Sequence, residues 1–279
     1  MHLIQSILMG LIQGLSEFLP ISSSAHLVFT SNLYKIFKNI EISQHSNQEI
    51  FFDIMLHFGT LIAVLIFFKK DIANILKAFI KGIKANNFQN NDFKIGLFII
   101  TGTVISTLIA FPLNKIASNL VFKPHYVGVL LILTGIILLL SEYISKKIVN
   151  KKDINIKNSI LIAIAQGVAA LPGFSRSGLT ISTGLILGLD RTTAARYSFL
   201  LSIPIILGAS ILYPVFTIDL NEIIRYNWIS IIIGTITSGI VGYLCIKYFM
   251  KFLAKFSLTF FGYYCLIIGI LSTGFFLGR

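Results

Sequence analysis

Residues 13–26 read QGLSEFLPISSSAH, which places an amide, a carboxylate, an imidazole and a run of three hydroxyls in an otherwise apolar stretch. An unpaired polar group costs several kcal/mol in hydrocarbon, so such residues indicate a functional site by default. Gln13 and Glu17 are four residues apart and share one face of a helix. Pro20 ends that helix. We therefore expect Ser22–Ser24 to lie at the break beside free backbone N–H groups, in an anion pocket at membrane depth.

The composition identifies an integral membrane protein. Of the 279 residues, 55% are hydrophobic and 12% are charged, and the mean hydropathy is +0.85. A soluble domain carries about 25% charged residues. The formal net charge is +12, but the lysines cluster between apolar runs and therefore indicate topology and contacts with anionic lipids. No soluble basic face remains for nucleic acid, so a nucleic-acid partner is not expected.

The hydropathy pattern predicts six transmembrane helices and two broken apolar segments within a single membrane domain, residues 1–279. The broken segments, 1–30 and 159–189, are predicted to be re-entrant helical hairpins, because non-helical backbone at that depth must be covered by protein or a wet cavity. Basic segments 69–94 and 144–157 are predicted to be cytoplasmic, so the first hairpin enters from the outer face. The six predicted spans are Phe52–Phe68, Ile95–Leu113, Tyr126–Leu140, Tyr197–Phe216, Trp228–Tyr248 and Phe256–Leu277.

The two broken segments resemble each other. Residues 6–14 read SILMGLIQG and residues 159–167 read SILIAIAQG, and the pair Leu19–Pro20 is followed by its counterpart Leu171–Pro172. Chance similarity between Ile/Leu-rich segments is the alternative. The order of the matches favours an all-α, inverted-topology repeat, with copies at about 1–143 and 158–279. Such a repeat places its polar site near the midplane, where the broken segments meet.

Residues 172–180 read PGFSRSGLT and carry the second polar cluster. The guanidinium of Arg176 is always charged and matches a phosphate or carboxylate with two hydrogen bonds. Ser175, Ser177 and Gly178 allow close backbone approach and further hydrogen bonds. The alternative for Arg176 is a side chain that extends to the membrane interface. Thr180 can reach the site, although a hydrogen bond back to its own helix is the commoner role.

Each polar residue of the first cluster has a functional and a structural interpretation. Glu17 can act as a general acid or base, hold a divalent cation, or accept hydrogen bonds at another helix N-terminus. Gln13 can orient Glu17 or a phosphate oxygen, or it can pack between helices. Ser23 can be a nucleophile with His26 as its base, or it can satisfy backbone groups after the break. Asp53 and His57, at the start of a span, can line the pocket, but capping and packing explain them equally well.

With both clusters considered together, the chain resembles the bacterial undecaprenyl-pyrophosphate phosphatase family, the integral-membrane type linked to bacitracin resistance. The residues that match the first family motif are Gln13, Glu17, Pro20, Ser22, Ser23 and His26. Residues 172–180 match the second. The resemblance covers essentially the whole chain. There are two departures: Gln13 replaces a common Glu, which weakens a two-carboxylate metal site, and Ala25 replaces a common Gly.

The resemblance implies hydrolysis of undecaprenyl pyrophosphate to the monophosphate at the outer face of the bacterial cytoplasmic membrane, which recycles the lipid carrier of peptidoglycan synthesis. It also implies a divalent cation, Mg²⁺ or Ca²⁺, without an organic cofactor, a homodimer, and competition from bacitracin, which binds the substrate. Glu17, Ser23, His26 and Arg176 are the expected catalytic residues, with Glu17 also holding the metal. The expected substrate-binding residues are Gln13, Ser22, Ser24, Ser175, Ser177, Gly178 and Thr180.

A transporter is the alternative from another class. Inverted repeats with broken helices are common in secondary transporters, so the same pocket can serve a lipid-phosphate flippase with Arg176 on the head group and Glu17 relaying protons. The dense Ser/His cluster favours the enzyme, because it exceeds what binding alone requires. A purely structural scaffold would not need charge inside the membrane.

Overall fold

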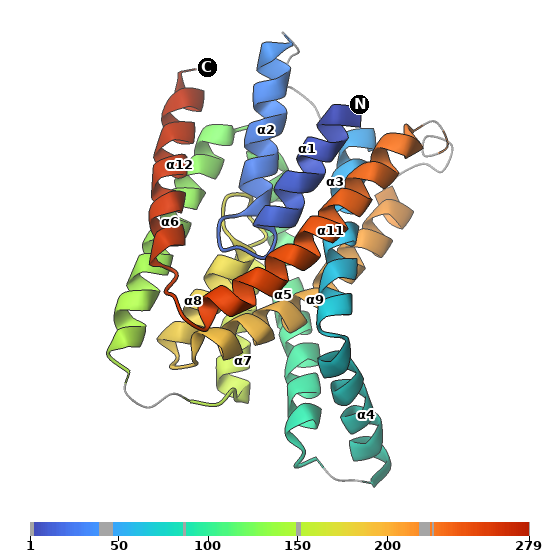
Figure 1. The fold of residues 1–279 in the computed structure, drawn as a ribbon, viewed down its shortest axis with the longest axis vertical. Helices are drawn as coiled ribbons and strands as arrows, with labels where there is room; N and C mark the ends of the chain where they lie inside the picture. The colour runs from blue at the N-terminus through green and yellow to red at the C-terminus, as the bar shows by residue number, and fades with distance from the viewer. Residues whose placement is uncertain are drawn as a thin grey trace.

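The computed structural model describes residues 3–38, 47–85, 88–148, 152–217, 224 and 226–278, and these residues form helices without a strand (Figure 1). Six helices are long and apolar enough to cross a membrane, which makes the chain a multi-pass integral membrane protein. They are α3 (Asn47–Phe67), α5 (Asn91–Leu120), α6 (Pro124–Lys146), α9 (Arg191–Thr217), α11 (Trp228–Leu253) and α12 (Thr259–Leu277). The other helices are α1 (Leu3–Ser16), α2 (Ser23–Phe37), α4 (Lys69–Ala85), α7 (Ile156–Val168) and α8 (Arg176–Ile186).

Each of the six predicted spans coincides with one long helix, so that part of the fold prediction is confirmed. The boundaries differ most at α5, where the predicted span ends at Leu113 and the helix continues to Leu120. Pro112 lies inside this helix, because neighbouring helices in a membrane bundle can satisfy the backbone groups that a proline frees. The amphipathic helix α4 lies within the basic segment 69–94 and is not among the predicted elements.

The four helices of the broken segments are too short to span a bilayer. They have 14, 15, 13 and 11 residues for α1, α2, α7 and α8. At 1.5 Å per residue none exceeds about 23 Å, against a hydrocarbon core of about 30 Å. In Figure 1, α1 and α2 extend to the upper end of the bundle and α7 to the lower end. The two turns meet between them: Ser22 Oγ donates to the Phe174 carbonyl at 3.2 Å, and Ser177 Oγ donates to the Leu19 carbonyl at 3.0 Å.

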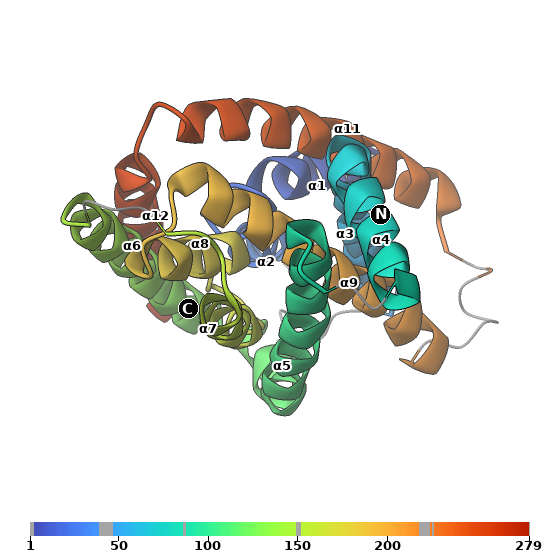
Figure 2. The ribbon, with the colours of Figure 1, turned by 90° about the horizontal axis from the view of Figure 1, so that it is seen from below.

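The first helix of each broken segment packs on a long helix through a glycine. Seen from below, α2 and α8 lie in the interior, with α11 along one edge and α5 toward the opposite edge (Figure 2). A Cβ on Gly14 of α1 would lie 2.8 Å from the Ser238 carbonyl oxygen of α11. A Cβ on Gly167 of α7 would lie 2.9 Å from the Ser106 carbonyl oxygen of α5. The two glycines that match in the sequence comparison therefore make the same kind of close contact.

Aromatic packing joins the first turn to the bundle. Phe18 is fully buried, and its ring meets that of Phe199 on α9 edge to face at a centroid distance of 5.3 Å. The ring of Phe249 on α11 also packs against Phe199, at a centroid distance of 6.3 Å. Such aromatic pairs contribute about 0.5–1.5 kcal/mol beyond the area that they bury. This packing holds the residue next to Glu17 in a fixed position.

Candidate active site

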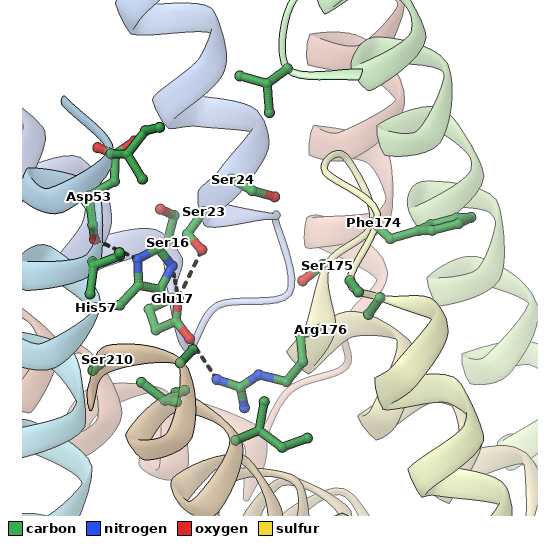
Figure 3. A pocket seen from close by; sticks show the side chains of 18 of the residues that line it. Ser16, Glu17, Ser23, Ser24, Asp53, His57, Phe174, Ser175, Arg176 and Ser210 are labelled. Carbon is green, nitrogen blue, oxygen red and sulfur yellow. Dashed lines mark hydrogen bonds and ion pairs between the residues drawn. The ribbon is translucent and has the colours of Figure 1, made fainter. Parts of the chain in front are cut away.

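A cavity of about 620 Å³ lies where the two turns meet. Residues from both turns and from α2, α3, α5, α8 and α9 line it (Figure 3). Its polar lining consists of Ser16, Glu17, Ser23, Ser24, Asp53, His57, Ser118, Ser175, Arg176 and Ser210. The rest of the lining is isoleucine, valine, phenylalanine and alanine. A polar cluster inside an apolar cavity suits a ligand with a charged head and a hydrocarbon tail.

The charged centre of the cavity is an ion pair between the two sequence motifs. Nη2 of Arg176 donates to Oε1 of Glu17 at 2.7 Å, although the two residues are 159 positions apart. The Glu17 side chain is 7% exposed and that of Arg176 is 17% exposed. A buried charge persists only when it is paired and hydrogen-bonded. The predicted juxtaposition of Glu17 and Arg176 is thus confirmed, while their catalytic roles stay a prediction.

The second carboxylate oxygen of Glu17 accepts two further hydrogen bonds. Ser23 Oγ donates to Oε2 at 2.8 Å and Gln13 Nε2 donates to it at 3.0 Å. Gln13 is fully buried one helical turn before Glu17 and is absent from the cavity lining, so it orients the carboxylate and does not face a ligand. The carboxylate consequently has one fixed orientation, with Ser23 and Arg176 on its two oxygens (Figure 3).

The start of α2 explains how Ser23 is presented. Ser22 caps α2 by accepting from the Ala25 N–H at 3.2 Å, and its φ of 68° lies in the left-handed region that non-glycine residues rarely adopt. Ser24 lines the cavity, lies 3.2 Å from Ser22 Oγ and accepts from the Gly173 N–H at 3.5 Å. Ser22 therefore builds the turn, whereas Ser23 and Ser24 face the cavity.

The second motif divides in the same way. Ser175 Oγ caps α8 by accepting from the Gly178 N–H at 3.1 Å, and only Ser175 and Arg176 of this motif's predicted site residues line the cavity. A Cβ on Gly178 would lie 2.9 Å from the Ser175 Cβ. Thr180 Oγ1 donates to the Arg176 carbonyl at 2.7 Å and lies 2.6 Å from Ser198 Oγ. Together with Ser177, which bonds to Leu19, these residues shape the turn behind Arg176.

Both ring nitrogens of His26 lie close to hydrogen-bonding groups outside the cavity lining. Its Nδ1 is 2.8 Å from the Ser22 carbonyl, and its Nε2 is 2.8 Å from the hydroxyl of Tyr264 on α12. The two rings also stack at a centroid distance of 5.8 Å. Both ring nitrogens are therefore engaged away from Ser23, and His26 is not among the cavity-lining residues. The structure thus gives His26 partners other than Ser23, and its role as the base stays a prediction.

His57 is the imidazole that the cavity does contain. Its Nε2 lies 3.7 Å from Oε2 of Glu17, and its Nδ1 is 2.8 Å from the Asp53 carbonyl in the preceding turn of α3 (Figure 3). From the sequence, packing and a position in the pocket explain His57 equally well. The indication that it lines the pocket is the four-residue spacing of Asp53 and His57 at the start of a span, which places both on one face of α3.

The family resemblance implies a divalent cation at Glu17. Among the described residues, no group of three His, Cys, Asp or Glu side chains is arranged to hold a metal ion. The oxygens of Glu17 already accept hydrogen bonds from Arg176, Ser23 and Gln13. Mg²⁺ commonly binds through one or two carboxylates together with substrate phosphates. The residues therefore fit a cation that enters with a phosphate ligand, with Glu17 as its protein carboxylate.

The chain is similar to known proteins over nearly its whole length. The family model described as bacitracin resistance protein BacA matches residues 6–271. An undecaprenyl-diphosphatase of Halothermothrix orenii is 39% identical over 97% of each chain. An undecaprenyl-diphosphatase of Methanosphaera stadtmanae is 38% identical over 98% of this chain and 97% of the relative. Undecaprenyl-diphosphatase 1 of Pseudoalteromonas translucida is 35% identical over 97% of each chain.

Proposed function

Because the chain belongs to the family described as bacitracin resistance protein BacA, we propose that it hydrolyses undecaprenyl pyrophosphate to undecaprenyl phosphate and inorganic phosphate. Relatives that align with nearly the whole chain carry the name undecaprenyl-diphosphatase. The observation that carries the proposal is the Glu17–Arg176 pair, which is held inside an apolar cavity by two turns from distant parts of the chain.

The cavity offers separate environments to the two parts of this substrate. Arg176 and the hydroxyls of Ser24 and Ser175 surround the place where a pyrophosphate would bind. Phosphoryl transfer depends mainly on charge neutralisation and positioning, and a fixed guanidinium supplies both. Isoleucines of α3 and α9, including Ile54 and Ile206, provide the apolar lining for the first part of the prenyl tail.

Ser23 is the proposed nucleophile. Its Oγ would attack the terminal phosphorus while the bond from that phosphorus to the bridging oxygen breaks, so undecaprenyl phosphate leaves with the bridging oxygen. The hydroxyl proton passes to Oε2 of Glu17, which already accepts its hydrogen bond at 2.8 Å. Water then hydrolyses the phosphoserine, which releases phosphate and restores the hydroxyl. Direct attack by water, with Ser23 as a phosphate ligand, is the competing route.

A divalent cation, Mg²⁺ or Ca²⁺, is proposed to enter with the pyrophosphate and bind Glu17. When bound, it would neutralise phosphate charge. No organic cofactor is needed for this hydrolysis. Gln13 would keep the Glu17 carboxylate in its present orientation. Arg176 would bind the phosphate oxygens with or without a cation between Glu17 and the pyrophosphate.

The membrane topology is also a proposal. Two re-entrant hairpins, belonging to inverted repeats at about 1–143 and 158–279 of one membrane domain, would bring the site to the midplane. The short helices and the matching contacts of Gly14 and Gly167 support it. The cavity would open at the outer face of the bacterial cytoplasmic membrane, where bacitracin would compete by binding the substrate. The basic segments 69–94 and 144–157, which are predicted to be cytoplasmic, support this orientation. A homodimer remains a prediction.

Phosphate release from the purified protein in detergent tests the proposed function. We expect release from undecaprenyl pyrophosphate, with loss of activity in Ser23→Ala and in Arg176→Gln. Near-normal turnover of Ser23→Ala would exclude the serine route. Phosphoserine at Ser23, trapped by acid quench with labelled substrate, would exclude direct attack by water. A protein that only carries the lipid across the membrane would release no phosphate.

A further inference from the structure

We propose that α4 and the first turn of α5 form a binding surface for the head groups of anionic lipids, separate from the catalytic cavity. In Figure 1 these two elements project together at the lower end of the bundle, away from the turns that form the cavity. The sequence of α4 is KKDIANILKAFIKGIKA, with five lysines and a single acidic residue. None of these seventeen residues lines the cavity.

One side of α4 is fixed against α5. Ile75 is buried, and the Phe79 ring stacks on that of Phe93 at a centroid distance of 5.1 Å. Gly96 allows this approach, because a Cβ there would lie 3.1 Å from Ile75 and 3.3 Å from Phe79. The orientation of α4 about its own axis is therefore set by packing. The sides of α4 that do not pack against α5 carry its exposed residues.

The outward sides of α4 combine an apolar stripe with a lysine stripe. Leu76, Ile80 and Ile83 are each more than half exposed. A lysine follows each of them by one residue, which on a helix is a rotation of about 100°. These three lysines, Lys77, Lys81 and Lys84, are exposed. A helix with an apolar stripe beside a lysine stripe is typical of a lipid interface, where the lysines extend to the head groups.

The contacts with α5 set the level of this surface in the membrane. The apolar part of α5 follows Lys94, whereas the first turn is polar, with the cap Asn90 exposed and Asp92 half-buried. The packing of Phe79 on Phe93 places the last two turns of α4 beside this polar end. The lysine stripe therefore lies where α5 leaves the hydrocarbon, which is the level of lipid head groups.

Charge decides which lipids fit. The acidic residue of α4, Asp71, is held by Arg196 of α9, whose Nε donates to its Oδ1 at 2.6 Å. Lys77, Lys81 and Lys84 make no ion pair within the described part of the chain. Each lysine near an anionic membrane surface contributes about 1 kcal/mol. A phosphatidylglycerol head group carries a net negative charge, which is complementary to the lysine stripe. Phosphatidylcholine carries no net charge.

Native mass spectrometry of the detergent-purified protein, titrated with phosphatidylglycerol or phosphatidylcholine, tests the proposal. We expect phosphatidylglycerol to bind more tightly, and K77Q/K81Q/K84Q to weaken its binding at least about tenfold, given the contribution per lysine. The arginine variant K77R/K81R/K84R should keep the affinity. The matched control K247Q/K251Q/K255Q removes the same charge from exposed positions of α11 and its following loop and should change the affinity less than threefold.

Equal losses in the two glutamine triples would show that net charge alone attracts the lipid, and this would overturn the proposal. Equal binding of the two lipids by the unaltered protein would overturn it as well. A photoreactive residue at Ile80 in liposomes containing 30% phosphatidylglycerol adds a positional test. Cross-linking to that lipid supports the proposal, whereas cross-linking to a second copy of the chain would make this face a protein interface and contradict it.

Discussion

The buried ion pair between Glu17 and Arg176 predicts a specific pattern of stability in three variants. Arg176→Gln removes the guanidinium that donates to Glu17 Oε1 at 2.7 Å and leaves a carboxylate that is 7% exposed without its cation. Breaking a buried pair by removing one partner costs about 3–5 kcal/mol. Because Arg176 lines the cavity and its side chain is 17% exposed, we expect a loss at the lower end, about 3 kcal/mol.

Removing the second charge should recover most of this loss. In Glu17→Gln/Arg176→Gln no charge remains to be desolvated, and two amides of similar shape occupy the site. We expect the double variant to be more stable than Arg176→Gln by about 2 kcal/mol, because the penalty for the isolated carboxylate is gone. The assay is equilibrium unfolding by SDS in mixed micelles for the wild type, both single variants and the double variant.

Two outcomes would refute this reasoning. If Arg176→Gln is as stable as the wild type, the carboxylate does not depend on the guanidinium. If the double variant shows the full sum of the two single losses, the residues contribute independently and the pair is not coupled. Both charge variants should lack phosphatase activity whatever their stability, so the stability cycle and the activity assay report different properties of the same pair.

Three further predictions concern other residues. Ser23→Ala should lower kcat for undecaprenyl pyrophosphate at least about a thousandfold by removing the nucleophile, with circular dichroism as the check on folding. His26→Phe removes the hydrogen bonds to Ser22 and Tyr264 but no group that lines the cavity. It should therefore lower the free energy of unfolding by about 1–3 kcal/mol and kcat by less than about tenfold. A loss of kcat like that of Ser23→Ala would instead support His26 as the base. Gly14→Leu should cost about 1–3 kcal/mol of stability through its clash with α11, whereas Gly274→Leu, where an added Cβ meets nothing within 4 Å, should be neutral.

The juxtaposition of Glu17 and Arg176 could be predicted from the sequence because both lie in broken apolar segments that resemble each other. A charge in such a segment needs a partner, and the predicted inverted repeat would bring the two segments together. The same reasoning identified the six spans, whose length and hydropathy are local properties. The two motifs also contain the residues that shape the turns, and their predicted contact with substrate stays a prediction.

The roles of the two histidines could not be predicted, because they depend on which neighbour each helix faces. His26 is drawn to Tyr264, which is 238 positions away, and His57 faces Glu17 across a helix interface. The spacing of Asp53 and His57 indicates a shared face of α3, but the partner that each histidine contacts cannot be predicted from the local sequence. The same holds for α4, where a short amphipathic helix and a basic loop look alike until the packing of Phe79 on Phe93 is known.

The measurement that tests the central claim most directly is phosphate release from undecaprenyl pyrophosphate by Glu17→Gln, compared with wild type in the same detergent. The variant keeps the shape of the side chain but removes the acceptor of the Ser23 proton and the counter-charge of Arg176. We expect kcat to fall by about three orders of magnitude while substrate binding persists through Arg176. Turnover within a few-fold of wild type would contradict a catalytic role for this carboxylate and, with it, the proposed site.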